Sequence, residues 1–228
     1  MKNIIGNVLM SFAILGWIKA EIVFPEDGVT LNYTHIMFRW TQEPDCNLYN
    51  LVVINSSNDT TVNVHTGRTM YIDQTNFNWG QGYVAMLTPI YENENNAQTV
   101  DTISFNIGPA YNFADLNIEI INAEDTQDGL ALFSQVSPNF RMVAIDKLGN
   151  QVWNSEFAYI NHWNEHGQLF GMKDGRGVEV NFYDDILWMT PSGTEIDAHE
   201  IKQIPNGNYM GITTQYLSLI HISEPTRP

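Results

Sequence analysis

Short runs in which apolar and polar residues alternate dominate this chain, and runs with helical spacing are scarce. Residues 36–41 show the alternation clearly, because Ile36, Phe38 and Trp40 would share one face of an extended strand. A two-residue period is typical of a half-buried β-strand. Gly, Asn, Asp and Pro separate the runs, as they do at turns. The pattern predicts an all-β protein.

The strands expected between residues 22 and 107 are short and closely spaced, which is typical of a β-sandwich. We therefore expect a sandwich domain over residues 21–108. The segment resembles a fibronectin type III domain. The residues that carry the resemblance are Pro25, Gly28, Trp40, Tyr49-x-Leu51-x-Val53, Trp79-x-x-x-Tyr83-x-Ala85 and Ser104-Phe105-x-Ile107.

Residues 109–128 form an Asn-, Asp- and Glu-rich linker, and the spacing of the predicted strands changes after it. Two predicted hairpins have tips at Gly149 and Gly193, 44 residues apart, and the second is expected to return along residues 194–197. Hairpin repeats of about 40–45 residues are typical of β-propeller blades. We predict a partial propeller of about two blades over residues 129–216, with a third hairpin beginning at Ile201.

The second region also resembles the bacterial arylsulfotransferases that need no nucleotide sulfate donor. The residues that carry this resemblance are Gly129-Leu130-Ala131-Leu132-Phe133-Ser134, Val143-Ala144-Ile145-Asp146-x-x-Gly149-x-x-Val152-Trp153 and Asp197-Ala198-His199-Glu200-Ile201-x-x-Ile204-Pro205-Asn206-Gly207-Asn208-Tyr209. The order of leader, small sandwich and propeller agrees with that family.

The resemblance implies an enzyme that moves a sulfuryl group from a phenolic sulfate to another phenol through a sulfated histidine. His199 matches an early channel histidine of the family, which implies a substrate-binding or acid/base role. The histidine that becomes sulfated has no match here and is expected beyond Tyr216, so we expect the chain itself to be inactive. Neutral imidazole can exchange protons near neutral pH, which suits such a role.

Other functions stay open at this stage. A non-catalytic extracellular propeller that binds or scaffolds a partner would have the same fold. His162 and His166 would ligate a metal only if they lay four residues apart on a helix, and Arg141 could be structural or face a channel. We expect no metal and no cofactor, and small phenolic sulfates as the substrates of the complete protein.

The two ends of the chain are not expected to belong to the fold. Residues 1–20 have a short basic start, an apolar run and a small residue at Ala20, as in a secretory signal peptide cleaved after Ala20. Residues 217–228 match a one-frame translation of a common sequencing adapter, so the natural protein is expected to continue past Tyr216.

Net charge limits the kinds of partner expected for this chain, and cysteine content indicates where the protein is located. The chain has 228 residues, with 10 Lys and Arg against 26 Asp and Glu, and a formal net charge of −16. A polyanion binds phosphate backbones and anionic membrane surfaces poorly, so we expect no nucleic-acid partner and, after removal of the leader, no membrane. With Cys46 as the one cysteine no disulfide can form within the chain, and we expect a secreted or periplasmic bacterial protein.

Overall fold

The computed structural model describes residues 19–92, 100–111, 122, 124–125, 127–135, 141–156, 159–197 and 199–213. These residues form β-strands and turns and contain no helix, so the predicted all-β class is confirmed. The expected leader up to residue 18, most of the expected linker and residues 214–228 lie outside the described residues.

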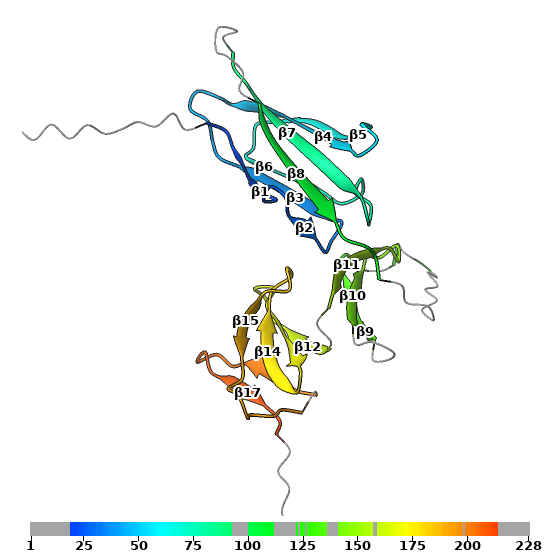
Figure 1. Cartoon of the computed structure of the whole chain (residues 1–228), viewed down its shortest axis with the longest axis vertical. Helices are drawn as coiled ribbons and strands as arrows, with labels where there is room; N and C mark the ends of the chain where they lie inside the picture. Colours follow the sequence, from blue (N-terminus) through cyan, green and yellow to red (C-terminus); the bar gives the residue numbers. More distant parts are fainter. Residues whose placement is uncertain are drawn as a thin grey trace, which may run out of the picture. The chain divides into compact units, whose positions relative to one another are not determined.

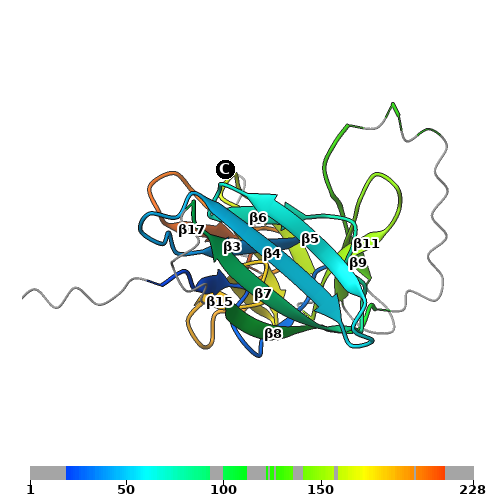
Figure 2. The same cartoon turned by 90° about the horizontal axis from the view of Figure 1, so that it is seen from above.

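Two compact units make up the described chain. The first comprises residues 19–29, 36–77 and 81–106, and the second comprises residues 30–35, 78–80 and the described residues from 107 onward. Figure 1 and Figure 2 show the strands of both units, which are described here in turn.

The first unit is built on two sheets, with strand orders β1-β3-β6 and β2-β8-β7-β4-β5. All pairs are antiparallel except that of β2 with β8, and β2 belongs to segment 30–35, which is grouped with the second unit. In Figure 2 the long strands β5, β4 and β7 lie side by side. The strands are β1 (Ile22–Phe24), β2 (Thr30–Leu31), β3 (Ile36–Trp40), β4 (Leu48–Asn55), β5 (Thr60–Thr66), β6 (Met70–Asp73), β7 (Gly82–Ile90) and β8 (Asp101–Ile107).

Alternate residues of these strands form the core between the sheets. Ile36, Phe38 and Trp40 of β3 are all buried, as their alternation predicts. Phe38 meets Phe105 of β8 with ring centroids 5.9 Å apart, and Trp40 meets Tyr49 of β4 at 5.6 Å. Because each pair joins one sheet to the other, the first unit is a β-sandwich with an aromatic core.

The second unit contains a three-stranded sheet, a four-stranded sheet and a hairpin, all antiparallel between sequence neighbours. The strands are β9 (Ala131–Gln135), β10 (Arg141–Ile145), β11 (Gln151–Ser155), β12 (Tyr159–Trp163), β13 (Leu169–Lys173), β14 (Arg176–Val180), β15 (Ile186–Met189), β16 (Ile201–Gln203) and β17 (Tyr209–Gly211).

Two buried clusters hold the second unit together. The larger one joins the sheets of β9–β11 and β12–β15 through residues such as Met142, Trp153 and Val178. Trp153 Nε1 also donates a hydrogen bond of 2.8 Å to the carbonyl of Phe182. The smaller cluster packs Ile196 and Ile201 against Phe170, so it seats the β16–β17 hairpin on β13.

The free edge of β11 is covered by the short segment 30–35. The Thr34 amide donates to the Val152 carbonyl and the Asn154 amide donates to the Asn32 carbonyl, each at 2.9 Å. From segment 78–80, Trp79 Nε1 donates to the Gln151 carbonyl at 2.9 Å. Both segments fall inside the sandwich domain expected from the sequence, yet their contacts group them with the second unit.

One five-residue turn recurs at the hairpin tips. In four tips of the described chain, Asn or Asp comes first, and its Oδ1 accepts the amides of the third and fifth residues. The fourth residue is left-handed, with φ between 63° and 81°. This is a type I turn followed by a bulge, which suits twisted strands. The tips are 55–59, 146–150, 164–168 and 181–185.

The return strand predicted over residues 194–197 is wrong, because these residues form no strand. Instead the Ile196 amide donates to the Gly175 carbonyl at 3.1 Å, and the Ile196 side chain is buried beside Phe170. β15 pairs with β14 before the tip rather than with a strand after it. Burial of one isoleucine thus turns the chain away from the sheet.

Candidate functional site

His199, the histidine selected from the sequence, lies in the short segment that leads into β16. The chain leaves the core at Ile196 and enters it again at Ile201, and both side chains are buried. The Asp197 amide donates to the Ile212 carbonyl at 2.7 Å, and the Ile212 amide donates to the Glu200 carbonyl at 3.3 Å. These bonds to the end of the β16–β17 hairpin fix the segment on both sides of His199.

Asp197 orients the His199 ring. The His199 amide donates to Asp197 Oδ1 at 2.9 Å, and His199 Nδ1 contacts the same oxygen. An ionised carboxylate only accepts, so Nδ1 carries the hydrogen and neutral imidazole has its free electron pair on Nε2. Since 77% of the side chain is exposed, Nε2 is open to solvent. The side-chain hydrogen bond from His199 lowers the pKa of Asp197, as does the bond from the His199 amide.

Two further cationic groups lie near this pair. Lys202 Nζ is 2.6 Å from Glu200 Oε1, and its hydrogen bond and charge lower the pKa of Glu200. His162 lies on β12, which contacts β16, and makes a smaller contribution to lowering the pKa of Glu200. His162 also packs on Phe170, with ring centroids 5.8 Å apart. The structure therefore brings His162, Lys202 and the Asp197–His199 pair to one part of the second unit.

An aromatic and acidic cluster adjoins this region. Trp188 and Tyr209 are parallel, with ring centroids 3.5 Å apart, and the Tyr209 hydroxyl donates to the Glu179 carboxylate. Gln168 Nε2 donates to the other Glu179 oxygen, and Glu179 is buried. Burial, then the bond to Glu179, raises the pKa of Tyr209 to about 12. We call Gln168, Glu179, Trp188 and Tyr209 the Glu179 cluster.

Asp197 and Glu179 did not stand out as partners in the sequence. The Asp-x-His spacing is a usable signal for the first, because short Asp side chains often bond the backbone two residues further on. Glu179 stands between two buried valines of β14, and an acidic residue in an apolar strand indicates a buried partner. Nothing local identifies that partner as Tyr209, which is 30 residues away.

The other candidates from the sequence have structural roles or lie apart. His166 is exposed at the 164–168 tip, so it does not share a helix face with His162. Arg141 places its guanidinium 4.2 Å from the centre of the Tyr111 ring. Cys46 is fully buried, and its thiol donates to the Leu48 carbonyl at 3.1 Å.

The described part of the chain contains no cluster of three or more His, Cys, Asp or Glu side chains that could hold a metal ion. It also contains no helix long and apolar enough to cross a membrane.

Comparisons with known proteins do not assign the chain to a family. No protein-family model matches it, and no curated protein matches it. Among solved structures, it is similar to one described as "Crystal Structure of FN3tt", with 12% sequence identity and a TM-score of 0.26. That match covers 39% of this chain and 90% of the other.

Proposed function

We propose that this chain is the N-terminal part of an exported arylsulfotransferase-like protein, which transfers sulfuryl groups between phenolic sulfates and phenols. The observation that carries the proposal is the Asp197–His199 pair. Its free Nε2 can accept a proton from a phenol or return one to a phenolate, and Asp197 stabilises the imidazolium that forms. In this proposal the sulfated histidine lies beyond Tyr216, and His199 is the acid/base or substrate-binding group.

The architecture supports the proposal in two ways. The first unit is a sandwich, consistent with a fibronectin type III-like module. In the second unit, we propose that the four-stranded β12–β15 meander is one propeller blade and that β9–β11 belong to another. Ile186, Leu187, Met210 and Ile212 are exposed apolar residues, as expected where a further blade would pack.

Sulfuryl transfer by the complete protein tests this proposal. The assay follows release of 4-nitrophenol from 4-nitrophenyl sulfate with a phenol as acceptor. Loss of a positioned acid/base group is expected to reduce kcat by roughly 10²–10⁴-fold in His199→Gln. His166→Gln is the matched control, because His166 is an exposed histidine at a turn. Absence of transfer by the unsubstituted protein, or full activity of His199→Gln, would contradict the proposal.

A non-catalytic propeller that binds or scaffolds a partner is the second candidate. The positions of two arginines of the second unit favour this candidate. Arg176 donates to the Thr190 carbonyl, and Arg141 lies over Tyr111, so both are occupied elsewhere than at His199. Sulfuryl transfer needs cationic groups around the sulfate oxygens. A complete sequence without Arg and His in its later blades would favour this second candidate.

Export is part of the proposal and rests on the leader pattern of residues 1–20. We place the protein outside the cytoplasm, in the periplasm or secreted, with phenolic sulfates rather than nucleic acid as its ligands. Fractionation of cells that produce the complete protein tests this placement, and retention of an unprocessed chain in the cytoplasm would contradict it.

A further inference from the structure

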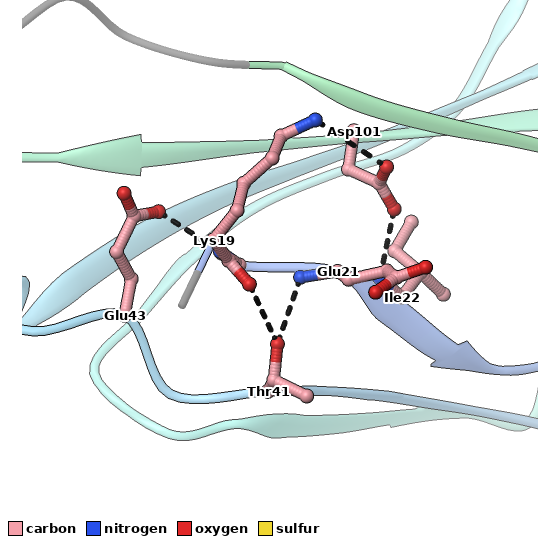
Figure 3. Close-up of polar contacts among 7 residues, drawn as sticks. Lys19, Glu21, Ile22, Thr41, Glu43 and Asp101 are labelled. Atoms are coloured by element: carbon pink, nitrogen blue, oxygen red, sulfur yellow. Dashed lines mark hydrogen bonds and ion pairs between the residues drawn. The ribbon is translucent and has the colours of Figure 1, made fainter. Parts of the chain in front are cut away.

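The backbone on both sides of the expected cleavage point after Ala20 is held by three side chains of the first unit, shown in Figure 3. The Thr41 hydroxyl donates to the Lys19 carbonyl at 2.9 Å and accepts from the Glu21 amide at 3.0 Å. The Ala20 amide donates to Glu43 Oε2 at 3.0 Å, and the Ile22 amide donates to Asp101 Oδ2 at 2.8 Å. Three successive backbone nitrogens thus meet a carboxylate, a hydroxyl and a second carboxylate.

Cleavage after Ala20 would remove several partners from this site at once. Glu43 would lose the Ala20 amide, and the Thr41 hydroxyl would lose the Lys19 carbonyl. Asp101 would lose Lys19 Nζ, which lies 3.7 Å from its Oδ1. Asp101 would then remain without the cationic side chain that points to it in Figure 3, and Glu43 without its backbone donor.

Hydrolysis of the Ala20–Glu21 peptide bond also creates a replacement for that cation. One water molecule is consumed, Ala20 keeps the new carboxylate, and the Glu21 nitrogen becomes an ammonium with three hydrogens. This nitrogen already lies 3.0 Å from Thr41 Oγ1. It is one residue, about 3.5 Å along an extended backbone, from each of the nitrogens that Glu43 and Asp101 now bind.

We propose that Thr41, Glu43 and Asp101 form a receptor for the α-ammonium of the processed chain, so that removal of the leader completes the N-terminal edge of the sandwich. The inference rests on the proposed export and cleavage after Ala20. The ammonium replaces Lys19 as the charge partner of Asp101 and the Ala20 amide as the partner of Glu43. Ion pairing of this kind offsets part of the packing lost with Ala20, whose side chain is buried.

The titratable groups that face this ammonium are the carboxylates of Glu21, Glu43 and Asp101, together with the Tyr91 hydroxyl, which donates to Glu43. Nearby carboxylates favour the protonated amine. The pKa of this amine is therefore expected above the ordinary value of about 8 for a chain terminus.

The first test is the N-terminal sequence and intact mass of the exported protein, which should begin at Glu21. The second is the rate of acylation of its α-amine at pH 8, measured by peptide mass spectrometry. The comparison chain is a synthetic peptide of residues 21–30, in which the Glu21 amine has neither Glu43 nor Asp101 beside it. Acylation is expected to be roughly fivefold slower in the processed chain, which is the loss of free amine at pH 8 when its pKa rises from about 8 to about 9.

Glu43→Gln and the exposed Glu26→Gln give the charge control. Glu43→Gln should restore most of the acylation rate, whereas Glu26→Gln should leave it low. A mature chain that begins anywhere else overturns both the cleavage site and the receptor. A chain that begins at Glu21 but is acylated as fast as the comparison chain overturns the receptor alone, with export intact.

Discussion

Removal of one hydroxyl from the Glu179 cluster tests how a buried carboxylate is kept in the second unit. In Tyr209→Phe the ring can still stack on Trp188, while Glu179 loses one of its two side-chain partners. A hydrogen bond to a charged group contributes about 1.5–3 kcal/mol, and Glu179 is only 3% exposed. We therefore expect Tyr209→Phe to destabilise the β16–β17 hairpin by about 2 kcal/mol.

Hydrogen exchange measures this loss locally, because Lys202 and Met210 are paired across the hairpin. The free energy of opening for the peptide that spans residues 201–211 should fall by the stated amount. In a Glu179→Gln background the charge is absent, and Tyr209→Phe should cost only about 1 kcal/mol. Equal costs in the two backgrounds would refute the idea that the hydroxyl serves the Glu179 charge.

Three other outcomes follow from the geometry of the second unit. In urea unfolding, Gly171→Ala should destabilise the β12–β15 sheet by about 3 kcal/mol or more, because its Cβ would lie 1.8 Å from the Tyr159 carbonyl oxygen. Gly108→Ala, whose nearest contact is at 3.5 Å, is the control and should cost less than about 1 kcal/mol. Burial raises the pKa of Asp184 above 3.8, so ionisation of this carboxyl removes stability as pH rises through its folded-state pKa. From pH 4 to pH 7 the urea midpoint of Asp184→Asn should therefore rise relative to that of the unsubstituted protein, and a difference that stays constant with pH would contradict this. The raised pKa of Tyr209 means that stability is lost as pH rises from about 10 to about 12, and alkaline unfolding of Tyr209→Phe should lack this component.

Local pattern predicted the buried faces well. Ile36, Phe38 and Trp40 could be assigned to one face because alternation within a strand depends only on neighbouring residues. The tip glycines Gly149 and Gly193 were recognisable for the same reason, since a left-handed residue is a local requirement.

The predictions that depend on distant contacts were less complete. Residues 194–197 have the composition of a strand, but Ile196 is buried beside Phe170 and its amide bonds to Gly175. The pairing of Glu179 with Tyr209 joins two sheets, and no spacing rule connects residues so far apart in sequence. The role of His199 stays a prediction from the sequence, and the structure adds the orientation of its ring.

The Asn- and Asp-led turns have a consequence for how the second unit folds. Each turn satisfies its own amides through a side chain of the same five residues, so it can form before any sheet is assembled. Among strands β9 to β17 of the described chain, each pairs only with its sequence neighbours, so these hairpins are local contacts, and segment 30–35 on the edge of β11 is the distant exception. Hairpin after hairpin can therefore form within microseconds as the chain emerges, whereas β1, β3 and β6 of the sandwich must first close longer loops.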